Sequence, residues 1–454
     1  MSFVSLNPTT NQVIQTYASW DAQRLERALE QAHSAQQLWA QTSLARRAKI
    51  LGDVATQLRA QLNQYAALIT REMGKPLREA RAEVEKCAVT CDYYAQHGAD
   101  FLRAEPVESD AGKSYIAYYP LGVVLAIMPW NFPFWQVFRF AAPALMAGNV
   151  GVLKHASNVP QCALAIEEVF RRAGFPRGVF QTLLVESGAV ARISGDERIA
   201  AATLTGSEPA GVQVAATAGR HLKKVVLELG GSDPFIVLRD ADLERACSVA
   251  TQARVINSGQ SCIAAKRFIV EQPIAKDFTA GFVEKMRSLR VGDPMDEATE
   301  VGPLARPDLV AELDRQVRRS LRKGARLLTG GKRLPGPGCF YAPTVLAGVR
   351  PGMPAYDEEI FGPVASVIVA RDADDAVRVA NDSRFGLGAS LWSRDVERAT
   401  ALARRIAAGL VFVNDLVKSD PRLPFGGVKK SGFGRELGAY GIKEFVNIKT
   451  LVVH

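Results

Sequence analysis

The stretch RVINSGQSCIAAKRFIV, residues 254–270, places Cys262 directly after polar turn residues and before an apolar run. A free cysteine often serves as a small buried hydrophobe, which is one interpretation of this residue. The other is a nucleophile, which needs a thiolate, access for a substrate, and neighbours that handle protons and developing negative charge. The local sequence alone leaves both interpretations open.

Two distant motifs carry groups that a nucleophilic cysteine needs. MPWNFP sets Asn131 between two prolines that fix the backbone, so its side-chain amide can be aimed at an oxyanion. LELGG puts Glu228 at the end of an apolar strand, where burial would raise the pKa of the carboxyl and suit it to acid or base catalysis. Taken singly, Asn131 can equally be a turn residue and Glu228 a paired surface carboxylate.

Two other motifs are suited to a nucleotide. LTGSEPAG places Gly206 and Ser207 where a strand passes into a helix, with backbone N–H groups that can meet a phosphate. LKHAS places Lys154 at the end of another strand, where its ammonium can hold a ribose or a phosphate. An ordinary turn explains the Gly-Ser pair equally well. No G-x-G-x-x-G follows a strand, since GFGREL from Gly432 lacks the last glycine.

The elements that must position these groups change character along the chain. Apolar residues spaced three and four apart predict helices over residues 21–40, 43–74 and 77–104, the second ending at Gly74 and Pro76. KSYIAYYPLG, residues 113–122, alternates like a hairpin strand and is expected outside the main core.

From Gly122 onward, short apolar runs alternate with helical segments, which indicates βαβ units and a parallel sheet covered on both faces. A second α/β domain is expected to begin near Gly230, because the alternation starts again there. The predicted strands are residues 123–128, 150–154, 179–185, 199–206, 233–238, 267–270 and 363–370, and the predicted helices between them are residues 159–174, 240–256, 274–289 and 372–382.

Length and composition fit a globular enzyme of more than one domain. The chain has 454 residues, 48% of them hydrophobic and 23% charged, which argues against extensive disorder. Six cysteines are too sparse for a disulfide framework, and no further ligands join Cys87 and Cys91 in a zinc set, so no metal is expected. Without a leader-like start or a long apolar run, a cytoplasmic protein that does not bind a membrane is expected.

The net charge of +9 raises the question of a nucleic-acid partner. The lysines and arginines are scattered through amphipathic helices rather than gathered in blocks, so nucleic-acid binding is not expected. A positive field that attracts an anionic cofactor or substrate is the simpler interpretation.

Taken together and in this order, six motifs make the chain resemble the aldehyde dehydrogenase superfamily over essentially its full length: PWNFP, LTGS, LELGG, GQSC, EEIFGPV and PFGGVKKSGFGRELG. EMGKP, GSDPFIVL and GVKKSGFGRE look most like the bacterial succinate-semialdehyde dehydrogenases. The resemblance implies an α/β fold with three parts, forming a homodimer or homotetramer. These are a Rossmann-like cofactor-binding domain (residues 1–101 and 121–229), an α/β catalytic domain (residues 230–432) and a small β oligomerisation element (residues 102–120 and 433–454).

The resemblance also implies catalytic roles for Cys262, Asn131 and Glu228. Cys262 would attack the aldehyde carbon and form a thiohemiacetal, whose oxyanion the Asn131 amide and the Cys262 backbone N–H would hold. Loss of one such donor typically costs about 100- to 1000-fold in rate. Hydride transfer to the nicotinamide would leave a thioester, and Glu228 would activate the water that releases the acid.

By the same resemblance, the cofactor is NADP or NAD. Where strictly NAD-using relatives carry a glutamate, this chain has Ser157, which removes the repulsion of a 2′-phosphate, so NADP is expected to be accepted. His155 stands beside Lys154 where the family usually has proline, and the sequence offers no account of it. The implied cofactor-binding residues are Ile127, Trp130, Lys154, Ser157, Gly206, Ser207, Leu229, Glu359 and Phe361.

For the substrate, Arg139 in WQVFRF matches an arginine that pairs with the distal carboxylate in succinate-semialdehyde enzymes. A second arginine of that pattern has no counterpart at Ile256, which leaves Ser419 and, as a further candidate, Arg422 beside Arg139. The expected reaction is NAD(P)-dependent oxidation of succinate semialdehyde to succinate. The alternatives are a dehydrogenase for glutarate semialdehyde or a neutral aldehyde, and an inactive family member that serves as a structural or binding protein.

Overall fold

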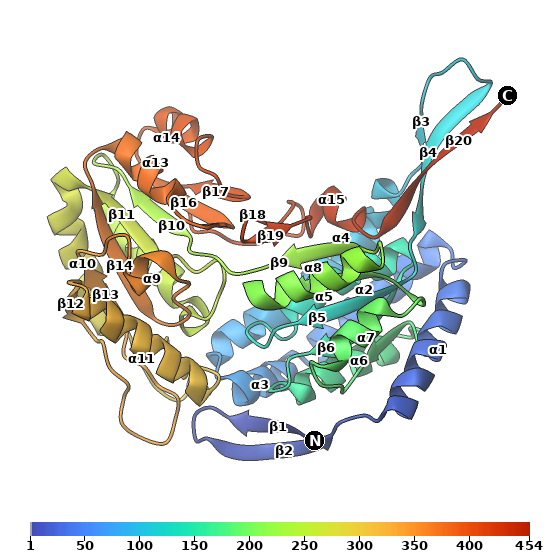
Figure 1. Ribbon diagram of the computed structural model, residues 1–454, viewed down its shortest axis with the longest axis horizontal. Coiled ribbons are helices and arrows are strands. Elements are labelled where there is room, and N and C mark those ends of the chain that lie inside the picture. The colour runs from blue at the N-terminus through green and yellow to red at the C-terminus, as the bar shows by residue number, and fades with distance from the viewer. Residues whose placement is uncertain (1) are drawn as a thin grey trace.

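Two twisted sheets and a projecting arm organise the computed structural model, which describes residues 2–454 (Figure 1). The first half of the chain builds a six-stranded sheet whose helices lie on both of its sides. Its strand order is β19 (Gly432–Phe433), β9 (Lys224–Glu228), β8 (Ile199–Thr205), β5 (Val123–Met128), β6 (Val150–His155) and β7 (Phe180–Thr182). All neighbours in this sheet are parallel except β19 and β9.

The second half of the chain builds a seven-stranded sheet. Its strand order is β12 (Arg326–Thr329), β13 (Thr344–Ala347), β14 (Val364–Ala370), β11 (Arg267–Glu271), β10 (Pro234–Val237), β16 (Gly388–Trp392) and β17 (Leu410–Val413). Only the β12–β13 pair is antiparallel. Alternate residues of β10 enter different cores, Ile236 on one face and Phe235 with Val237 on the other, so this sheet is covered on both faces.

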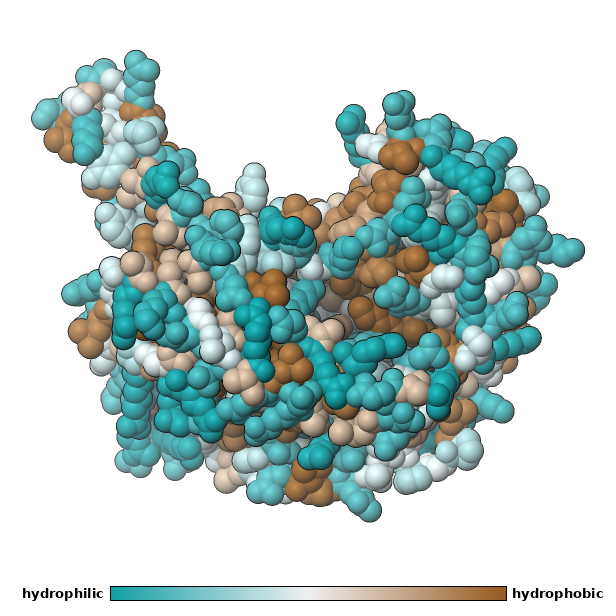
Figure 2. Space-filling view, turned by 180° about the vertical axis from the view of Figure 1, so that it is seen from behind, coloured by the Kyte–Doolittle hydropathy of each residue, from teal (hydrophilic) through white to brown (hydrophobic). Residues whose placement is uncertain are grey.

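The remaining strands form two short antiparallel pairs or belong to the arm. β1 (Ser2–Asn7) and β2 (Gln12–Ala18) form an antiparallel pair, and β15 (Phe385–Gly386) pairs with β18 (Val428–Lys429). β20 (Val446–Val453), β4 (Lys113–Pro120) and β3 (Glu105–Pro106) form a three-stranded antiparallel sheet with β20 at its edge. This arm stands clear of the body in Figure 2, as the alternation of residues 113–122 predicts.

The helices follow the predicted order, with one correction. Residues 43–74 form two helices that break at Gln61, whose φ of −120° is not helical, so the prediction of one continuous helix was wrong. The first half of the chain contains eight of the α-helices: α1 (Ala22–Trp39), α2 (Leu44–Ala60), α3 (Leu62–Met73), α4 (Leu77–Phe101), α5 (Trp135–Ala147), α6 (Pro160–Arg172), α7 (Ala189–Gly195) and α8 (Glu208–Arg220). Later in the chain come α9 (Leu243–Val255), α10 (Ala275–Ser288), α11 (Pro307–Arg322), α12 (Pro354–Asp357), α13 (Ala373–Asn381), α14 (Val396–Ala403) and α15 (Gly438–Ile442).

The predicted boundary at residue 229 falls between β9 and β10, which lie in different sheets. β19, although late in the chain, pairs with β9 of the first sheet, so the C-terminal segment returns to the first half of the molecule. Among residues 2–454, no helix combines the length and the apolar character needed to cross a membrane. The same residues contain no cluster of three His, Cys, Asp or Glu side chains placed to hold a metal ion.

Candidate active site

The loop before Cys262 has a conformation that few sequences tolerate. Asn257, Ser258 and Gly259 have φ values of 52°, 55° and 78°, three left-handed residues in succession. A Cβ at Gly259 would lie 2.3 Å from the carbonyl carbon of Gly362, so only glycine fits there. Such a strained loop must be fixed by its surroundings.

Buried hydrogen bonds supply that fixation. The Gln260 side-chain oxygen accepts from the Ala305 N–H at 2.8 Å, and the Ser258 hydroxyl accepts from the Gly302 N–H at 2.9 Å. On the other side of the nucleophile, the Lys266 ammonium donates to the carbonyls of Ser261, Cys262 and Ala264 at 2.8–3.0 Å. The turn residues and Lys266 therefore hold both flanks of Cys262.

Asn131 is bound to this same loop. Its side-chain Nδ2 donates to the Gln260 carbonyl at 3.0 Å, and the Asn257 amide donates to the Asn131 carbonyl at 2.7 Å. An amide nitrogen carries two N–H groups, so the second one on Asn131 can still donate to an oxyanion. The structure brings Asn131 and the Cys262 loop together, although the two lie far apart in the sequence.

Glu228 ends β9, and the turn that follows it passes against the same loop. A Cβ at Gly231, three residues later, would be 2.6 Å from the Cys262 carbonyl oxygen, so the LELGG turn passes directly against the nucleophile's backbone. The Glu228 side chain is 2% exposed, and neither carboxylate oxygen has a hydrogen-bond partner within residues 2–454. Burial raises its pKa well above the usual range, and the Arg139 charge opposes that shift.

Burial also dominates the chemistry of the Cys262 thiol. It raises the thiol pKa to about 12, against the nearby positive charges of Arg139 and Lys266. In the chain alone the sulfur is therefore protonated at neutral pH, and a base must take its proton before it attacks. The buried cysteines Cys87, Cys91 and Cys162 also have raised pKa values, but only Cys262 among these four lines the cavity described next.

Cys262 opens onto a cavity of about 610 Å³ between the two halves of the chain. Phe132, Trp135 and Phe425 give this cavity an aromatic wall, and the Lys86, Arg139 and Ser419 side chains add polar groups. A cavity of this size and mixed lining suits a small organic substrate with one polar end. The structure thus places the predicted residues Arg139 and Ser419 in the cavity that contains the predicted nucleophile.

Arg139 is less available than its sequence motif suggests. Its side chain is 2% exposed and forms an ion pair with the equally buried Glu436. Its Nη2 donates to the Thr205 hydroxyl at 3.2 Å, and the guanidinium lies 4.5 Å from the centre of the Phe425 ring. Arg422 is exposed and its guanidinium is bound to Asp420. Both arginines therefore already have a carboxylate partner inside the chain.

Three side chains on one face of α4 form hydrogen bonds to segments that surround the site. The sequence analysis did not identify these three residues. The Glu79 carboxylate accepts from the Asn257 N–H at 2.6 Å, and the Glu83 carboxylate accepts from the Phe134 and Trp135 N–H groups at 2.9 and 3.0 Å. The Lys86 ammonium donates to the Ser419 hydroxyl at 2.7 Å. Their spacing of four and three residues puts all three on one helix face, a signal that PLREARAEVEKC does contain.

The groups suited to a nucleotide phosphate lie at the ends of β6 and β8. Lys154, the last residue but one of β6, is a buried lysine whose pKa is lowered by burial, and its ammonium has no ion-pair partner within residues 2–454. Ser157 and Ser207 are exposed and follow these two strands in the sequence, and Ser207 occupies the N-cap position of α8 without a side-chain capping hydrogen bond. A buried lysine without an anion and an open helix start are a donor set that fits a phosphorylated cofactor.

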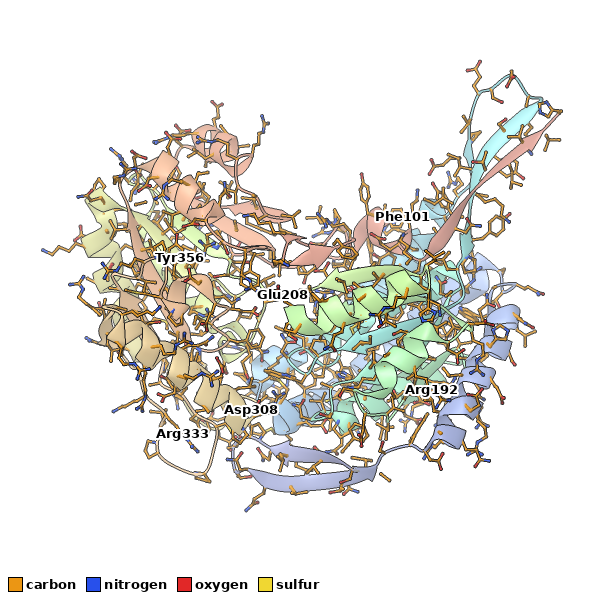
Figure 3. All side chains as sticks on the ribbon, viewed as in Figure 1. Phe101, Arg192, Glu208, Asp308, Arg333 and Tyr356 are labelled. Carbon is orange, nitrogen blue, oxygen red and sulfur yellow. The ribbon has the colours of Figure 1, made fainter. Side chains whose placement is uncertain are left out.

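The first turn of α8 also faces the second half of the chain. Glu208, labelled in Figure 3, is paired with Arg384, and Lys430 lies 3.6 Å away. Leu229, another predicted cofactor residue, is buried against this helix, because a Cβ at Gly211 would clash with its side chain at 2.6 Å. Gly206 hydrogen-bonds through its N–H to the Glu228 carbonyl at 3.0 Å, which ties the α8 start to the end of β9.

The predicted residues for the nicotinamide side come from both halves. The rings of Trp130 and Phe361 meet edge to face with centres 5.8 Å apart, and both are partly exposed, as is Ile127 at the end of β5. The Glu359 carboxylate accepts from the Gly231 N–H at 2.9 Å and lies 3.8 Å from the Lys266 ammonium. Glu359 therefore stands between the LELGG turn and the lysine that holds the Cys262 loop.

The structure gives His155 a positioning role. Its Nε2 hydrogen-bonds to the Pro133 carbonyl at 2.9 Å, and its Nδ1 accepts from the Ala156 N–H at 2.8 Å. Burial lowers its pKa to about 4, so the ring is neutral and carries its proton on Nε2. His155 thus ties the end of β6 to the PWNFP turn that carries Asn131.

Comparisons with known proteins place the chain among relatives over its full length. A model of the aldehyde dehydrogenase family matches residues 1–451. A probable NADP⁺-dependent succinate-semialdehyde dehydrogenase of Synechocystis is 52% identical over 451 residues, covering 99% of both chains. The NADP⁺-dependent succinate-semialdehyde dehydrogenase 1 of Mycobacterium tuberculosis is 53% identical over 454 residues, again covering 99% of both.

Solved structures are similar over the same length. Gox0499, studied for its selection of cofactor and substrate, superposes with a TM-score of 0.99 at 41% identity and complete coverage of both chains. Succinic semialdehyde dehydrogenase from Streptococcus pyogenes, in complex with NADP⁺, superposes with a TM-score of 0.98 at 39% identity and covers 99% of each chain. The predicted α/β fold of this superfamily is confirmed.

Proposed function

Because the chain belongs to the aldehyde dehydrogenase family, we propose that it is an NADP⁺-dependent enzyme that oxidises succinate semialdehyde to succinate. One observation carries this conclusion: identity of 52–53% over 99% of both chains to succinate-semialdehyde dehydrogenases that use NADP⁺. In balance, one aldehyde, one water and one NADP⁺ give one carboxylate, one NADPH and two protons.

The first step forms a bond between the Cys262 sulfur and the aldehyde carbon. The thiol first releases its proton to solvent in the cavity, since the thiolate is the nucleophile and burial raises the thiol pKa to about 12. The carbonyl oxygen becomes an alkoxide that accepts hydrogen bonds from the second Asn131 N–H and from the Cys262 backbone N–H. Both donors lie in the loop network described above, so they need little reorganisation as charge develops.

The second step breaks the C–H bond of this thiohemiacetal and the third releases the acid. NADP⁺, when bound, would supply the hydride acceptor, and the acyl group would remain on Cys262 as a thioester. Glu228 then takes a proton from water, which attacks the thioester carbon and expels the thiolate. A carboxylate with a raised pKa is a stronger base once ionised, and Glu228 has no competing hydrogen bond within residues 2–454.

For the cofactor we propose that Lys154 and Ser157 hold the adenosine ribose and its 2′-phosphate. Support comes from the lowered pKa and missing ion-pair partner of Lys154 within residues 2–454, and from the absence of a carboxylate at position 157. Gly206, Ser207 and Leu229 would border the pyrophosphate and its helix, whereas Ile127, Trp130, Glu359 and Phe361 would border the nicotinamide and its ribose. Retention of some NAD⁺ activity is part of this proposal.

We also propose that the protein is a homodimer or homotetramer joined through the arm. β20 is an edge strand, and Ile448, Val452 and Val453 on it are at least half exposed. An apolar edge strand of this kind is normally covered in a stable protein. Sedimentation of the wild type and of Ile448→Asp tests this, since a monomeric wild type contradicts the proposal.

The activity is tested by following NADPH formation with succinate semialdehyde, glutarate semialdehyde and butanal. The proposed function requires the highest kcat/KM for succinate semialdehyde. Equal rates with butanal would favour the neutral-aldehyde alternative, and a higher rate with glutarate semialdehyde would favour the longer substrate. No turnover of any of the three would favour an inactive structural member of the family.

A further inference from the structure

The Lys266 ammonium lies against the backbone of the nucleophile, although no step of the proposed mechanism uses it. Lys266 is 1% exposed and donates to the carbonyls of Ser261, Cys262 and Ala264 at 2.9, 2.8 and 3.0 Å. An ammonium has three N–H groups, so these three bonds use all of them and fix its orientation. Lys266 therefore holds a positive charge at one defined place beside Cys262.

The bond to Ser261 also sets the direction of the Cys262 backbone N–H. The Ser261 carbonyl and the Cys262 N–H belong to one peptide unit, and no peptide bond of residues 2–454 is cis. In a trans unit the C=O and N–H bonds point in opposite directions. Because the carbonyl is directed at the Lys266 ammonium, the N–H is directed away from it. Lys266 thus orients one of the two proposed oxyanion donors.

A buried carboxylate that the mechanism leaves unused lies near the same backbone. Asp233 is 2% exposed, its Oδ1 accepts from the Gly388 N–H at 3.1 Å, and its Oδ2 has no hydrogen-bond partner in the described part of the chain. A Cβ at Gly231 would lie 3.0 Å from Asp233 Oδ1 and 2.6 Å from the Cys262 carbonyl oxygen, so these two oxygens are neighbours. In such a buried place, where water does not screen charges, the Asp233 carboxylate acts on the Cys262 loop through its electric field.

Lys266 and Asp233 act on the Cys262 thiol in opposite directions. Burial raises the thiol pKa to about 12, which the positive charges of Arg139 and Lys266 oppose. The negative charges of Glu359 and Asp233 raise the thiol pKa further. Lys266 and Asp233 are the members of this set that neither line the substrate cavity nor belong to the predicted cofactor site.

We propose that Lys266 is a positioning residue for both functional groups of Cys262. It directs the backbone N–H toward the oxyanion, and its charge stabilises the thiolate, while an ionised Asp233 weakens that stabilisation. This inference rests on the proposed function, because it assumes that Cys262 is the nucleophile. Neither side chain lines the substrate cavity, so both should act equally on charged and neutral aldehydes.

The proposal sets a pH dependence near neutrality. Burial raises the pKa of Asp233 to about 7. The Lys266 charge, the Gly388 N–H and the Arg267 charge oppose this shift, and the Glu359 charge adds to it. Asp233 is neutral below its pKa and negative above it. Asparagine resembles the neutral form, so Asp233→Asn should match the wild type below pH 7 and have a more acidic thiol at the nucleophile above pH 7.

The experiment measures the ionisation of Cys262 directly, without aldehyde or cofactor. Alkylation by iodoacetamide is followed between pH 6 and pH 9 by intact mass, in the wild type, Lys266→Met and Asp233→Asn. Cys262→Ser gives the background, because the five other cysteines are buried. Lys223→Met is the control, since it removes a partly buried lysine whose ammonium donates to the Asp196 carbonyl, outside the substrate cavity.

Lys266→Met should slow alkylation by about 3- to 10-fold at each pH, because losing a nearby positive charge raises a thiol pKa by about one unit or more. The rate changes less than the fraction of thiolate does, since a more basic thiolate is also a better nucleophile. Asp233→Asn should speed alkylation by about 3-fold above pH 7 and leave it unchanged below. Lys223→Met should match the wild type throughout.

Turnover tests the direction of the Cys262 N–H as well. In Lys266→Met, kcat/KM should fall by the same factor for succinate semialdehyde and butanal. This fall should exceed the loss of alkylation rate, because turnover also needs an oriented oxyanion donor. A fall that only equals the loss of alkylation rate would refute the effect of Lys266 on the N–H.

Opposite signs in the two variants distinguish a charge effect from a loosened loop. Loosening would change the alkylation rate in the same direction in both variants and would refute the proposal, as would an equal change in Lys223→Met. An unchanged rate in either variant refutes the role of that residue. If urea unfolding shows that Lys266→Met is not folded, Asp233→Asn decides alone, because its amide oxygen can still accept from the Gly388 N–H. Faster alkylation above pH 7 then supports the proposal, and any other result refutes it.

The outcomes also separate this inference from the proposed function. If the wild type does not oxidise succinate semialdehyde, or if Cys262→Ser retains turnover, the proposed function or its mechanism fails. If the wild type is active and the alkylation rate does not respond to the two charges, only the role of Lys266 and Asp233 fails.

Discussion

The two ends of the substrate cavity are shaped by the same physical effect with opposite chemical consequences. At the reacting end, burial raises the pKa of Cys262, as it does that of Glu228 at the end of β9, which disfavours the charged form of both groups. At the far end, burial lowers the pKa of Lys86, so that group tends to lose its proton. Desolvation favours the neutral form of each group, whatever its type.

The reaction, however, needs the first two groups in their charged forms. Cys262 must become a thiolate and Glu228 must act as a carboxylate, whereas Lys86 as an ammonium attracts an anionic aldehyde to the cavity. The protein therefore combines reactive groups of raised pKa at one end with a cation that has no ion-pair partner within residues 2–454 at the other. Changes at the reacting end should affect every aldehyde, whereas changes at Lys86 should affect only charged ones.

The largest effect is expected from Cys262→Ser. A serine hydroxyl at this position loses its proton far less readily than a thiol, so NADPH formation should fall by about 10⁴-fold or more with succinate semialdehyde and butanal alike. The measurement is a steady-state assay at high enzyme concentration. Substantial activity in the variant would show that Cys262 is not the nucleophile, and Cys87→Ser, which changes a buried cysteine outside the cavity, is the control.

The next largest effect is expected from Arg139→Met. This change leaves Glu436 as a buried carboxylate without its partner, which typically costs about 3–5 kcal/mol of unfolding free energy. It also removes the charge that opposes protonation of Glu228, so turnover should fall for both aldehydes. Urea unfolding and the two kcat/KM values measure this.

A loss confined to succinate semialdehyde would contradict this effect on Glu228. It would indicate that Arg139 binds the substrate carboxylate, as the sequence analysis predicts. The double variant Arg139→Met with Glu436→Leu, which removes both charges, should recover stability if the pair is structural.

Much of the site was predictable because its motifs are local. The family and the α/β fold are confirmed, and each motif placed its residue at a strand end or turn, as with Glu228 at the end of β9. The break at Gln61 was not predictable, because neither glycine nor proline marks it and the apolar spacing continues across it.

Contacts between side chains that are distant in the sequence were harder to predict than the single residues of the site. The sequence shows that residue 139 is an arginine, but its ion-pair partner Glu436 lies almost 300 positions later, and no local sequence pattern connects the two. Lys86 was hidden for a similar reason: its neighbour Ser419 comes from another part of the chain, and a lysine on a helix normally faces solvent. Sequence indicates which groups exist, whereas the fold decides which charges are already neutralised.

The third prediction tests the opposite protonation of the two ends directly. With butanal, kcat/KM should rise with pH by up to about tenfold per unit, because Cys262 must lose its proton before it attacks the aldehyde. With succinate semialdehyde the same rise should flatten or reverse above pH 8, as Lys86 loses its charge. Parallel profiles for the two substrates would refute a titrating cation at the far end.

The smallest effect is expected from Ser157→Glu, which lies outside the cavity at the nucleotide end. A carboxylate there would repel the 2′-phosphate of NADP⁺ and accept from the 2′-hydroxyl of NAD⁺, so KM should rise about tenfold for NADP⁺ and fall for NAD⁺. Ser157→Ala, which adds no charge, should change KM for NADP⁺ less. The ratio of succinate semialdehyde to butanal turnover should stay constant in both variants, because Ser157 does not line the substrate cavity. A ratio that moved with the cofactor would mean that the two sites are coupled through the Cys262 loop that lies between them.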